Sequence, residues 1–126
     1  MIIVDSCGWL EWFTDGGLAD KFEPYLTDQE KILVPAVIFY EVYKVLKRAV
    51  GEEKALLAAA YMKNSRIIPF DETLALAAAD ISLKEGLAMA DAMIVAMAQA
   101  NGCAIITSDA DLKDQSNVTY ISKRKI

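Results

Sequence analysis

Ile2-Ile3-Val4-Asp5-Ser6 is the segment that decides the fold, because it places an acidic residue directly after three consecutive branched apolar residues. Three such residues in a row predict a short strand buried on both faces, and the polar pair predicts the cap of a following helix. In open parallel sheets, ligands bind outside the carboxyl ends of the strands. The segment therefore predicts a buried strand that ends in a carboxylate where a site would lie.

The same alternation of apolar strand and helix continues along the chain. Further strands are predicted at residues 32–34, 67–70, 103–106 and 118–121. Helices are predicted at residues 8–26 in two pieces, 35–50 with Pro35 in the first turn, 52–64, 71–86 and 90–100. Thr107-Ser108 is expected to cap a short helix over residues 109–113. This order predicts an α/β fold, a three-layer α/β/α sandwich with a short-stranded, mainly parallel sheet.

Length and composition indicate one soluble domain. The chain has 126 residues, of which 55% are hydrophobic, and no linker or low-complexity segment divides it. We expect a single domain over residues 1–126, with a core near 2–121 and a basic tail at 122–126. The sequence shows no secretion-signal pattern and no membrane-spanning apolar run, which predicts a cytoplasmic protein without membrane association. Cys7 and Cys103 are expected to be reduced packing residues.

The complete absence of histidine restricts the chemistry. It excludes serine or cysteine nucleophiles that a histidine activates, and ribonuclease mechanisms in which two histidines exchange protons. Hydrolysis near neutral pH would then depend on carboxylates, either as an acid–base pair or as ligands of an oxygen-binding cation.

The net charge of −5 argues against nucleic-acid binding through a uniformly basic surface. Local basic patches still occur, because Lys44, Lys47 and Arg48 fall on one predicted helix and residues 122–126 form the basic tail. An ordinary solvated surface explains each patch as well as a binding role does.

Four acids stand out by position: Asp5 after the first strand, Glu41 and Asp91 in helices, and Asp109 after the fourth strand. Helix capping or the helix dipole would explain Asp5 or Asp109 alone. Glu41 and Asp91 have apolar neighbours at helical spacing, where an ionised carboxylate needs a compensating partner. A bound cation is one such partner, and oxygen-only ligands favour Mg²⁺ or Mn²⁺.

Other conspicuous residues have structural explanations. Asp80 is expected to pair with Lys84 four residues later on a helix surface, so it receives no function. Trp9, Trp12 and Phe13 are expected to pack in the core or in a dimer interface rather than to stack on bases.

Four segments together resemble the acidic motifs of PIN-domain ribonucleases, and the compact VapC toxins in particular. They are residues 2–6, the Tyr40-Glu41-Val42 segment within residues 35–48, residues 90–96 and residues 105–112. The motifs occur in the order found in the family, and the similarity spans residues 2–121. Leu112 departs from the family pattern, because many relatives carry phenylalanine there.

The resemblance implies an endoribonuclease that depends on Mg²⁺ or Mn²⁺ and cleaves RNA at exposed loops, usually as a homodimer and with an antitoxin partner. Asp5 and Asp91 would be the main metal ligands, Glu41 a ligand or water-orienting base, and Asp109 a further acid. Asp109 is preferred over Asp111 as the fourth acid because it lies nearer the strand. Ser6 and Thr107 could orient carboxylates or water, although helix capping explains them equally well.

Three other functions compete with that of a toxin. A PIN nuclease that processes RNA without a toxin role, and a module that binds RNA or protein without cleaving it, both remain open. Phosphoryl-transfer proteins of the receiver or haloacid-dehalogenase kind fit poorly, because the latter need Asp-x-Asp where this chain has Asp5-Ser6-Cys7.

Overall fold

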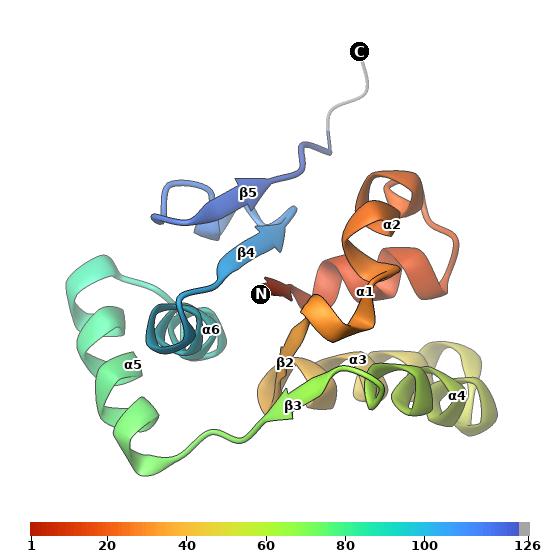
Figure 1. Ribbon diagram of the computed structural model, residues 1–126, viewed down its shortest axis with the longest axis horizontal. Coiled ribbons are helices and arrows are strands. Elements are labelled where there is room, and N and C mark those ends of the chain that lie inside the picture. Colours follow the sequence, from red (N-terminus) through yellow and green to blue (C-terminus); the bar gives the residue numbers. More distant parts are fainter. Residues whose placement is uncertain (124–126) are drawn as a thin grey trace.

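The structure is a computed structural model that describes residues 1–123, and these form short parallel strands surrounded by helices (Figure 1). The strands are β1 (Ile2–Val4), β2 (Leu33–Pro35), β3 (Arg66–Ile68), β4 (Ala104–Thr107) and β5 (Val118–Tyr120). The helices are α1 (Ser6–Phe13), α2 (Ala19–Leu26), α3 (Ala36–Val50), α4 (Glu52–Met62), α5 (Glu72–Glu85) and α6 (Met89–Asn101). Two short 3-10 helices, η1 (Gln29–Lys31) and η2 (Ala110–Leu112), complete the described chain.

The strands follow the order β3-β2-β1-β4-β5 and all pair in parallel. A single bridge between Ile2 and Ile32 joins β1 to β2, so the sheet consists of a three-stranded and a two-stranded part. The register sets Ile3 against Ile105 in the centre, and both side chains are buried. Because every strand points the same way, the residues that follow β1 and β4 meet at one edge.

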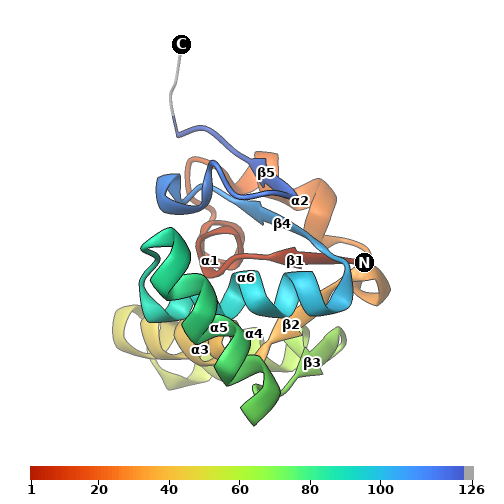
Figure 2. The ribbon, with the colours of Figure 1, turned by 90° about the vertical axis from the view of Figure 1, so that its left-hand side faces the viewer.

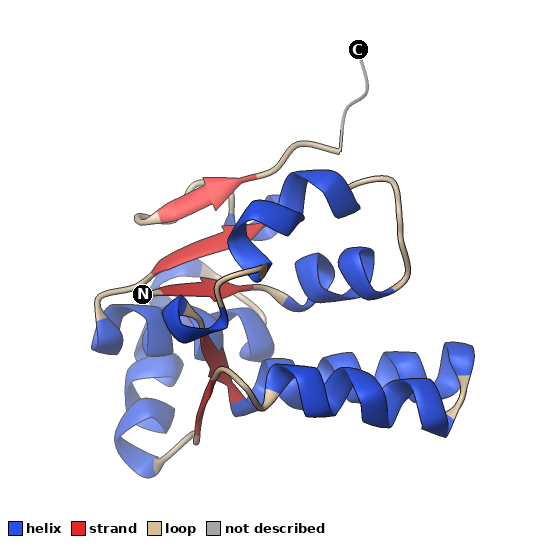
Figure 3. Ribbon diagram, turned by 45° about the vertical axis from the view of Figure 1, so that its right-hand side comes forward, coloured by secondary structure: helices blue, strands red, loops and turns tan. Residues whose placement is uncertain are grey.

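The helices form layers on the two sides of this sheet. Figures 1 and 2 show α5 and α6 together on one side, with α1 and α2 on the other. In Figure 3, α3 and α4 form a long pair that extends past the sheet. The prediction of a three-layer α/β/α sandwich with a mainly parallel sheet is therefore confirmed.

Two element boundaries differ from the predictions for physical reasons. Pro35 is the last residue of β2 rather than the first turn of α3, because its ψ of 139° is extended and the helix begins at Ala36. Strand β3 ends at Ile68, since Pro69 has no N–H to donate to a neighbouring strand.

The prediction that Thr107-Ser108 caps the last short helix was wrong. The N-cap of η2 is Asp109, whose side chain accepts a hydrogen bond from the Asp111 backbone N–H. Thr107 instead accepts a hydrogen bond from the Asp109 N–H at 2.9 Å. The cap is one residue later because Thr107 still belongs to β4.

Trp9 belongs to the core, which excludes it from any interface between subunits. Its ring is fully buried and packs against Phe13 and Tyr61, and Trp12 contacts the same two rings. The Tyr61 hydroxyl donates to the Leu26 carbonyl at 3.0 Å, which links this cluster to α2. The aromatic side chains of α1 thus anchor the helix that follows Asp5.

Three further predictions concern the surface and the cysteines. No helix within residues 1–123 is long and apolar enough to cross a membrane. Cys7 and Cys103 are free thiols, with Cys103 buried, as expected for packing residues. In the predicted basic tail, Ser122 and Lys123 are exposed, while residues 124–126 lie outside the described part of the chain.

Candidate metal centre

Four elements far apart in the sequence bring the four predicted acids to one cavity. Asp5 follows β1, Glu41 lies in α3, Asp91 lies in the first turn of α6, and Asp109 follows β4. All four line a cavity of about 230 Å³, together with Ser6, Cys7 and Lys123. The parallel sheet explains this convergence for Asp5 and Asp109, since the carboxyl ends of neighbouring strands share an edge.

Asp5 is held in a fixed orientation by hydrogen bonds to both of its carboxylate oxygens. The Thr107 hydroxyl donates to Oδ2 at 2.7 Å, and the Ser6 backbone N–H donates to Oδ1 at 2.8 Å. The Thr107 hydroxyl oxygen in turn accepts from the Asp109 N–H. Thr107 therefore fixes the positions of two of the four acids relative to each other.

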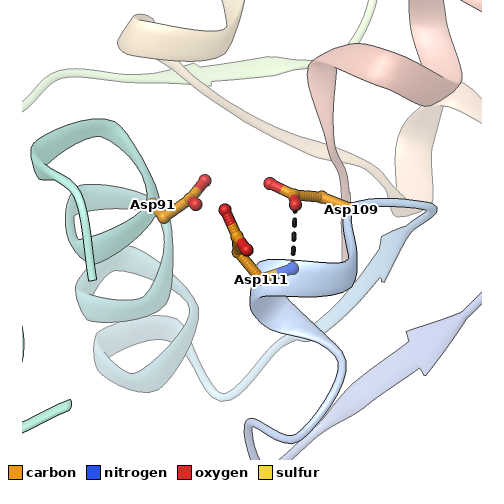
Figure 4. Close-up of side chains that lie close together, drawn as sticks. All are labelled: Asp91, Asp109 and Asp111. Atoms are coloured by element: carbon orange, nitrogen blue, oxygen red, sulfur yellow. Dashed lines mark hydrogen bonds between the residues drawn. The ribbon is translucent and has the colours of Figure 1, made fainter. Parts of the chain in front are cut away.

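Asp91, Asp109 and Asp111 form a tighter group at the same edge. One carboxylate oxygen from each lies within 4.8 Å of the others, and Figure 4 shows the three side chains turned toward one another. The hydrogen bond between the Asp109 carboxylate and the Asp111 N–H, 2.9 Å long, closes the turn that places Asp111 opposite Asp91. Asp109 belongs both to this group and to the cavity that Asp5 and Glu41 line.

The grouping of these acids disfavours their charged forms. The pKa of Asp91 is raised to about 7, first by burial and then by the negative charges of Asp109, Asp5 and Asp111. Burial also raises the pKa of Asp5, against the effect of its hydrogen bonds from Thr107 and Ser6. The pKa of Glu41 is raised by burial and by Asp5, while Lys44 acts in the opposite direction.

Protein cations compensate these carboxylates poorly. Within residues 1–123 the ion pairs are Lys31–Asp28 and Lys47–Glu52, and neither reaches the cavity. Lys123 lines the cavity but forms no ion pair with its acids within the described chain. The carboxylates therefore keep unneutralised negative charge close together, which is the condition that a divalent cation relieves.

The donor set fits a hard divalent cation. All the candidate ligands are carboxylate oxygens, and those of Asp91, Asp109 and Asp111 lie within 4.8 Å of one another. Small side-chain rotations would bring them to the distance of about 2.1 Å at which oxygens bind Mg²⁺. Oxygen-only sites of this kind suit Mg²⁺ or Mn²⁺ rather than zinc, which prefers nitrogen or sulfur ligands. Asp91, Asp109 and Asp111 have oxygens near enough to one another to hold such an ion, and Asp5 and Glu41 line the adjoining cavity.

Two residues that line the cavity, Cys7 and Lys123, were not predicted as site residues, and the ion pair predicted for Asp80 does not form within residues 1–123. Cys7 was assigned to packing only, yet its Sγ lies 3.6 Å from the Thr107 hydroxyl and 3.4 Å from the Ser108 nitrogen. Its position two residues after Asp5 in the first turn of α1 was the available signal. Lys123 was placed in a basic tail whose role was left open between binding and an ordinary surface. Asp80 is exposed and forms no ion pair with Lys84 within residues 1–123, so its predicted partner was wrong.

Comparison with known proteins places this arrangement in a family. The family model of the PIN domain matches residues 2–117, and the chain therefore belongs to the PIN-domain family. No curated protein sequence is recognisably similar to the chain.

Solved structures share the fold at low sequence identity. A toxin–antitoxin complex from Klebsiella pneumoniae is 19% identical with a TM-score of 0.80, over 94% of this chain and 96% of that one. VapC20 of Mycobacterium tuberculosis, described as a toxin that cleaves the sarcin–ricin loop, is 16% identical with a TM-score of 0.79, over 94% and 97% of the chains. FitAcB from Neisseria gonorrhoeae is 20% identical with a TM-score of 0.72, over 97% of each chain. The chain thus has the fold of the VapC toxins.

Proposed function

We propose that this protein is a cytoplasmic endoribonuclease that depends on Mg²⁺ or Mn²⁺, cleaves RNA at exposed loops and acts as the toxin of a toxin–antitoxin pair. The observation that carries the proposal is the convergence of Asp5, Glu41, Asp91 and Asp109 on one cavity, in a chain without histidine. Carboxylates are then the groups at this site that can bind a cation and move a proton at neutral pH.

The surroundings of each of the four acids suit it to a different role. Asp5, fixed by Thr107 and Ser6, and Asp91 would be the principal metal ligands. Glu41 is half-buried and lines the same cavity, and its raised pKa suits a group that orients the attacking water and accepts its proton. When bound, the cation would lower the pKa of water and stabilise negative charge on the phosphate. Asp109 and Asp111 would complete the acidic edge.

The test of this function is a cleavage assay with chemically defined products. The purified chain should cut single-stranded or loop RNA with Mg²⁺ or Mn²⁺, leave 5′-phosphate ends, and stop when EDTA is added. Cleavage that survives complete chelation, or 2′,3′-cyclic phosphate ends, would refute the mechanism. Tight RNA binding without any cleavage would favour the non-catalytic module instead.

The toxin role draws on the assemblies in which similar folds occur. The similar structures include toxin–antitoxin complexes, some of them bound to DNA. We propose an antitoxin partner that places an arginine or lysine against the acids of the cavity, because such a cation would neutralise them and occupy the metal position. An RNA-processing PIN nuclease would share the chemistry and lack this partner.

We further propose a homodimer, formed through apolar side chains exposed on α5 and at the start of α6. Leu76, Leu83 and Met89 are 71%, 87% and 77% exposed, and large apolar side chains this exposed often mark an interface. This places the interface away from Trp9, which is buried.

Leu76→Glu combined with Leu83→Glu should convert the dimer to a monomer, because each change puts a charge into the interface without touching the core. Light scattering coupled to size exclusion at tens of micromolar, roughly the range of moderate affinities, measures the mass. Leu56→Glu on α4 is the control, because it makes the same change at an exposed leucine outside the proposed interface, and Leu56 is 53% exposed. A wild-type chain that is monomeric at this concentration would contradict the dimer.

A further inference from the structure

One face of α3 carries aromatic and basic side chains immediately beside the acidic cavity. Tyr40, Lys44 and Arg48 recur at intervals of four residues, so they lie along the same face of the helix. All three are exposed, with Tyr40 at 59%. They contribute to a surface hollow of about 420 Å³ that is lined by Phe39, Tyr40, Tyr43, Lys44, Lys47 and Arg48. We call this the α3 hollow.

The charge of the α3 hollow contrasts with that of the whole chain. The protein carries a net charge of −5, yet three of the six residues that line the hollow are cations and none is an acid. Lys47 is partly neutralised by Glu52 at 3.3 Å, whereas Lys44 and Arg48 have no ion pair within residues 1–123. Lys44 and Arg48 thus form a local positive patch on an acidic protein, and such a patch favours a polyanionic ligand.

The aromatic rings of the α3 hollow indicate that this polyanion has unpaired bases. The Lys44 ammonium lies 5.5 Å from the centre of the Tyr40 ring, and the Lys47 ammonium lies 5.6 Å from that of Tyr43. An exposed ring beside a cation is the combination with which proteins bind single-stranded nucleic acid, because a base stacks on the ring while the cation binds a phosphate. A polyanion without bases, such as an acidic peptide, would not need the exposed Tyr40 ring.

The spacing along α3 connects the hollow to the acids. Glu41 lines the acidic cavity, and Lys44 lies one turn further along the same helix, close enough to act on the pKa of Glu41. At a rise of about 1.5 Å per residue, Lys44 and Arg48 lie about 4.5 and 10.5 Å beyond Glu41 along the helix axis. In a stacked strand the rise per nucleotide is about 3.4 Å along the axis. Lys44 and Arg48 therefore lie beside the first few nucleotides next to the cut.

We propose that the α3 hollow is the binding surface for the single-stranded RNA that flanks the cleaved phosphate, with Tyr40 stacking on a base and with Lys44 and Arg48 binding phosphates. This inference rests on the proposed nuclease function and assigns the side on which the substrate leaves the cavity. The strand would run from the acids along α3, on the helix pair that extends past the sheet in Figure 3.

The test measures binding without turnover. The full chain carrying Asp91→Asn is titrated against a fluorescently labelled single-stranded RNA with Mg²⁺ present, and anisotropy is recorded at several salt concentrations. Lys44→Gln with Arg48→Gln should weaken binding by about tenfold and reduce the slope of log K against log salt by about 0.7 for each cation removed. Tyr40→Ala should weaken binding by at least about fivefold with little change in the slope.

The matched control removes two charges from the opposite edge of the sheet. Lys31 and Lys63 precede β2 and β3, so they lie at the amino ends of the strands, and both are exposed. Lys31→Gln with Lys63→Gln should leave RNA binding unchanged. Equal weakening by both pairs would mean a nonspecific effect of net charge, and no weakening by the α3 changes would place the RNA elsewhere. Either result overturns the inference. It is also overturned if the α3 changes abolish binding to a co-purifying protein and leave RNA binding intact.

The cleavage assay keeps this inference separate from the nuclease proposal. Binding through α3 by an unmodified chain that cuts no RNA would refute the nuclease and support the hollow. Cleavage by the unmodified chain, with RNA affinity unaffected by the α3 changes, would refute the hollow alone.

Discussion

Asp5→Asn, Glu41→Gln and Asp91→Asn are each expected to lower the turnover of RNA cleavage by on the order of 10²-fold or more. Each amide keeps the shape of the side chain but loses the charge that would bind the cation or accept a proton. Turnover is measured as single-turnover cleavage of a labelled loop RNA with Mn²⁺. Asp80→Asn is the control and should be silent, because Asp80 is exposed on α5 and does not line the acidic cavity.

The same variants separate catalysis from folding. The pKa of Asp91 is raised, so the folded state disfavours its ionised form and the charged acid destabilises the metal-free protein. Asp91→Asn should therefore raise the melting temperature in EDTA above pH 7, and this gain should vanish as the pH falls below the ordinary value of 3.8. Amides that unfold the chain, or that leave cleavage near the wild-type rate, would show that the acids are structural.

Metal affinity is expected to be about a hundredfold weaker at pH 5 than at pH 8, because the metal must displace the proton from Asp91. With a pKa of about 7, Asp91 is mostly ionised at pH 8 and almost entirely protonated at pH 5. Asp5 and Glu41 act in the same direction, since their pKa values are raised too. The affinity is measured by titrating metal-free protein with Mn²⁺ and quantifying the free ion by its electron paramagnetic resonance signal.

Asp91→Asn is the control for this pH dependence. The variant should bind Mn²⁺ more weakly at pH 8 and should show a shallower decline toward pH 5, because its strongest proton competitor is gone. A wild-type affinity that is flat between pH 5 and pH 8 would rule out Asp91 as a ligand.

The strands and helices with a regular pattern of apolar residues could be predicted from the sequence. The apolar runs at residues 2–4 and 103–106 are short and continuous, so they predicted buried parallel strands and thereby the shared edge of Asp5 and Asp109. The apolar neighbours of Glu41 and Asp91 indicated that these acids face the interior. The resemblance to PIN domains supported the same four residues.

The local contacts could not be predicted, because they depend on geometry that no periodicity encodes. The opposition of Asp111 to Asp91 needs the 3-10 turn that Asp109 caps, and the α/β pattern does not distinguish that turn from a short α-helix. The hydrogen bond from Thr107 to Asp5 joins residues 102 positions apart. Trp9 was left between core and interface, because an amphipathic helix specifies which face is apolar and not what covers it.

The hydrogen bond from Thr107 to Asp5 also sets the order of events during protein synthesis. Strand β1 is made well before Asp91, its neighbour β4 and Asp109. Until those residues are free of the ribosome, Asp5 lacks its hydrogen bond from Thr107 and the acidic cavity is incomplete. If the site cleaves RNA, a growing chain that does not yet include Asp109 should be inactive, because its acidic cavity lacks one of its four acids.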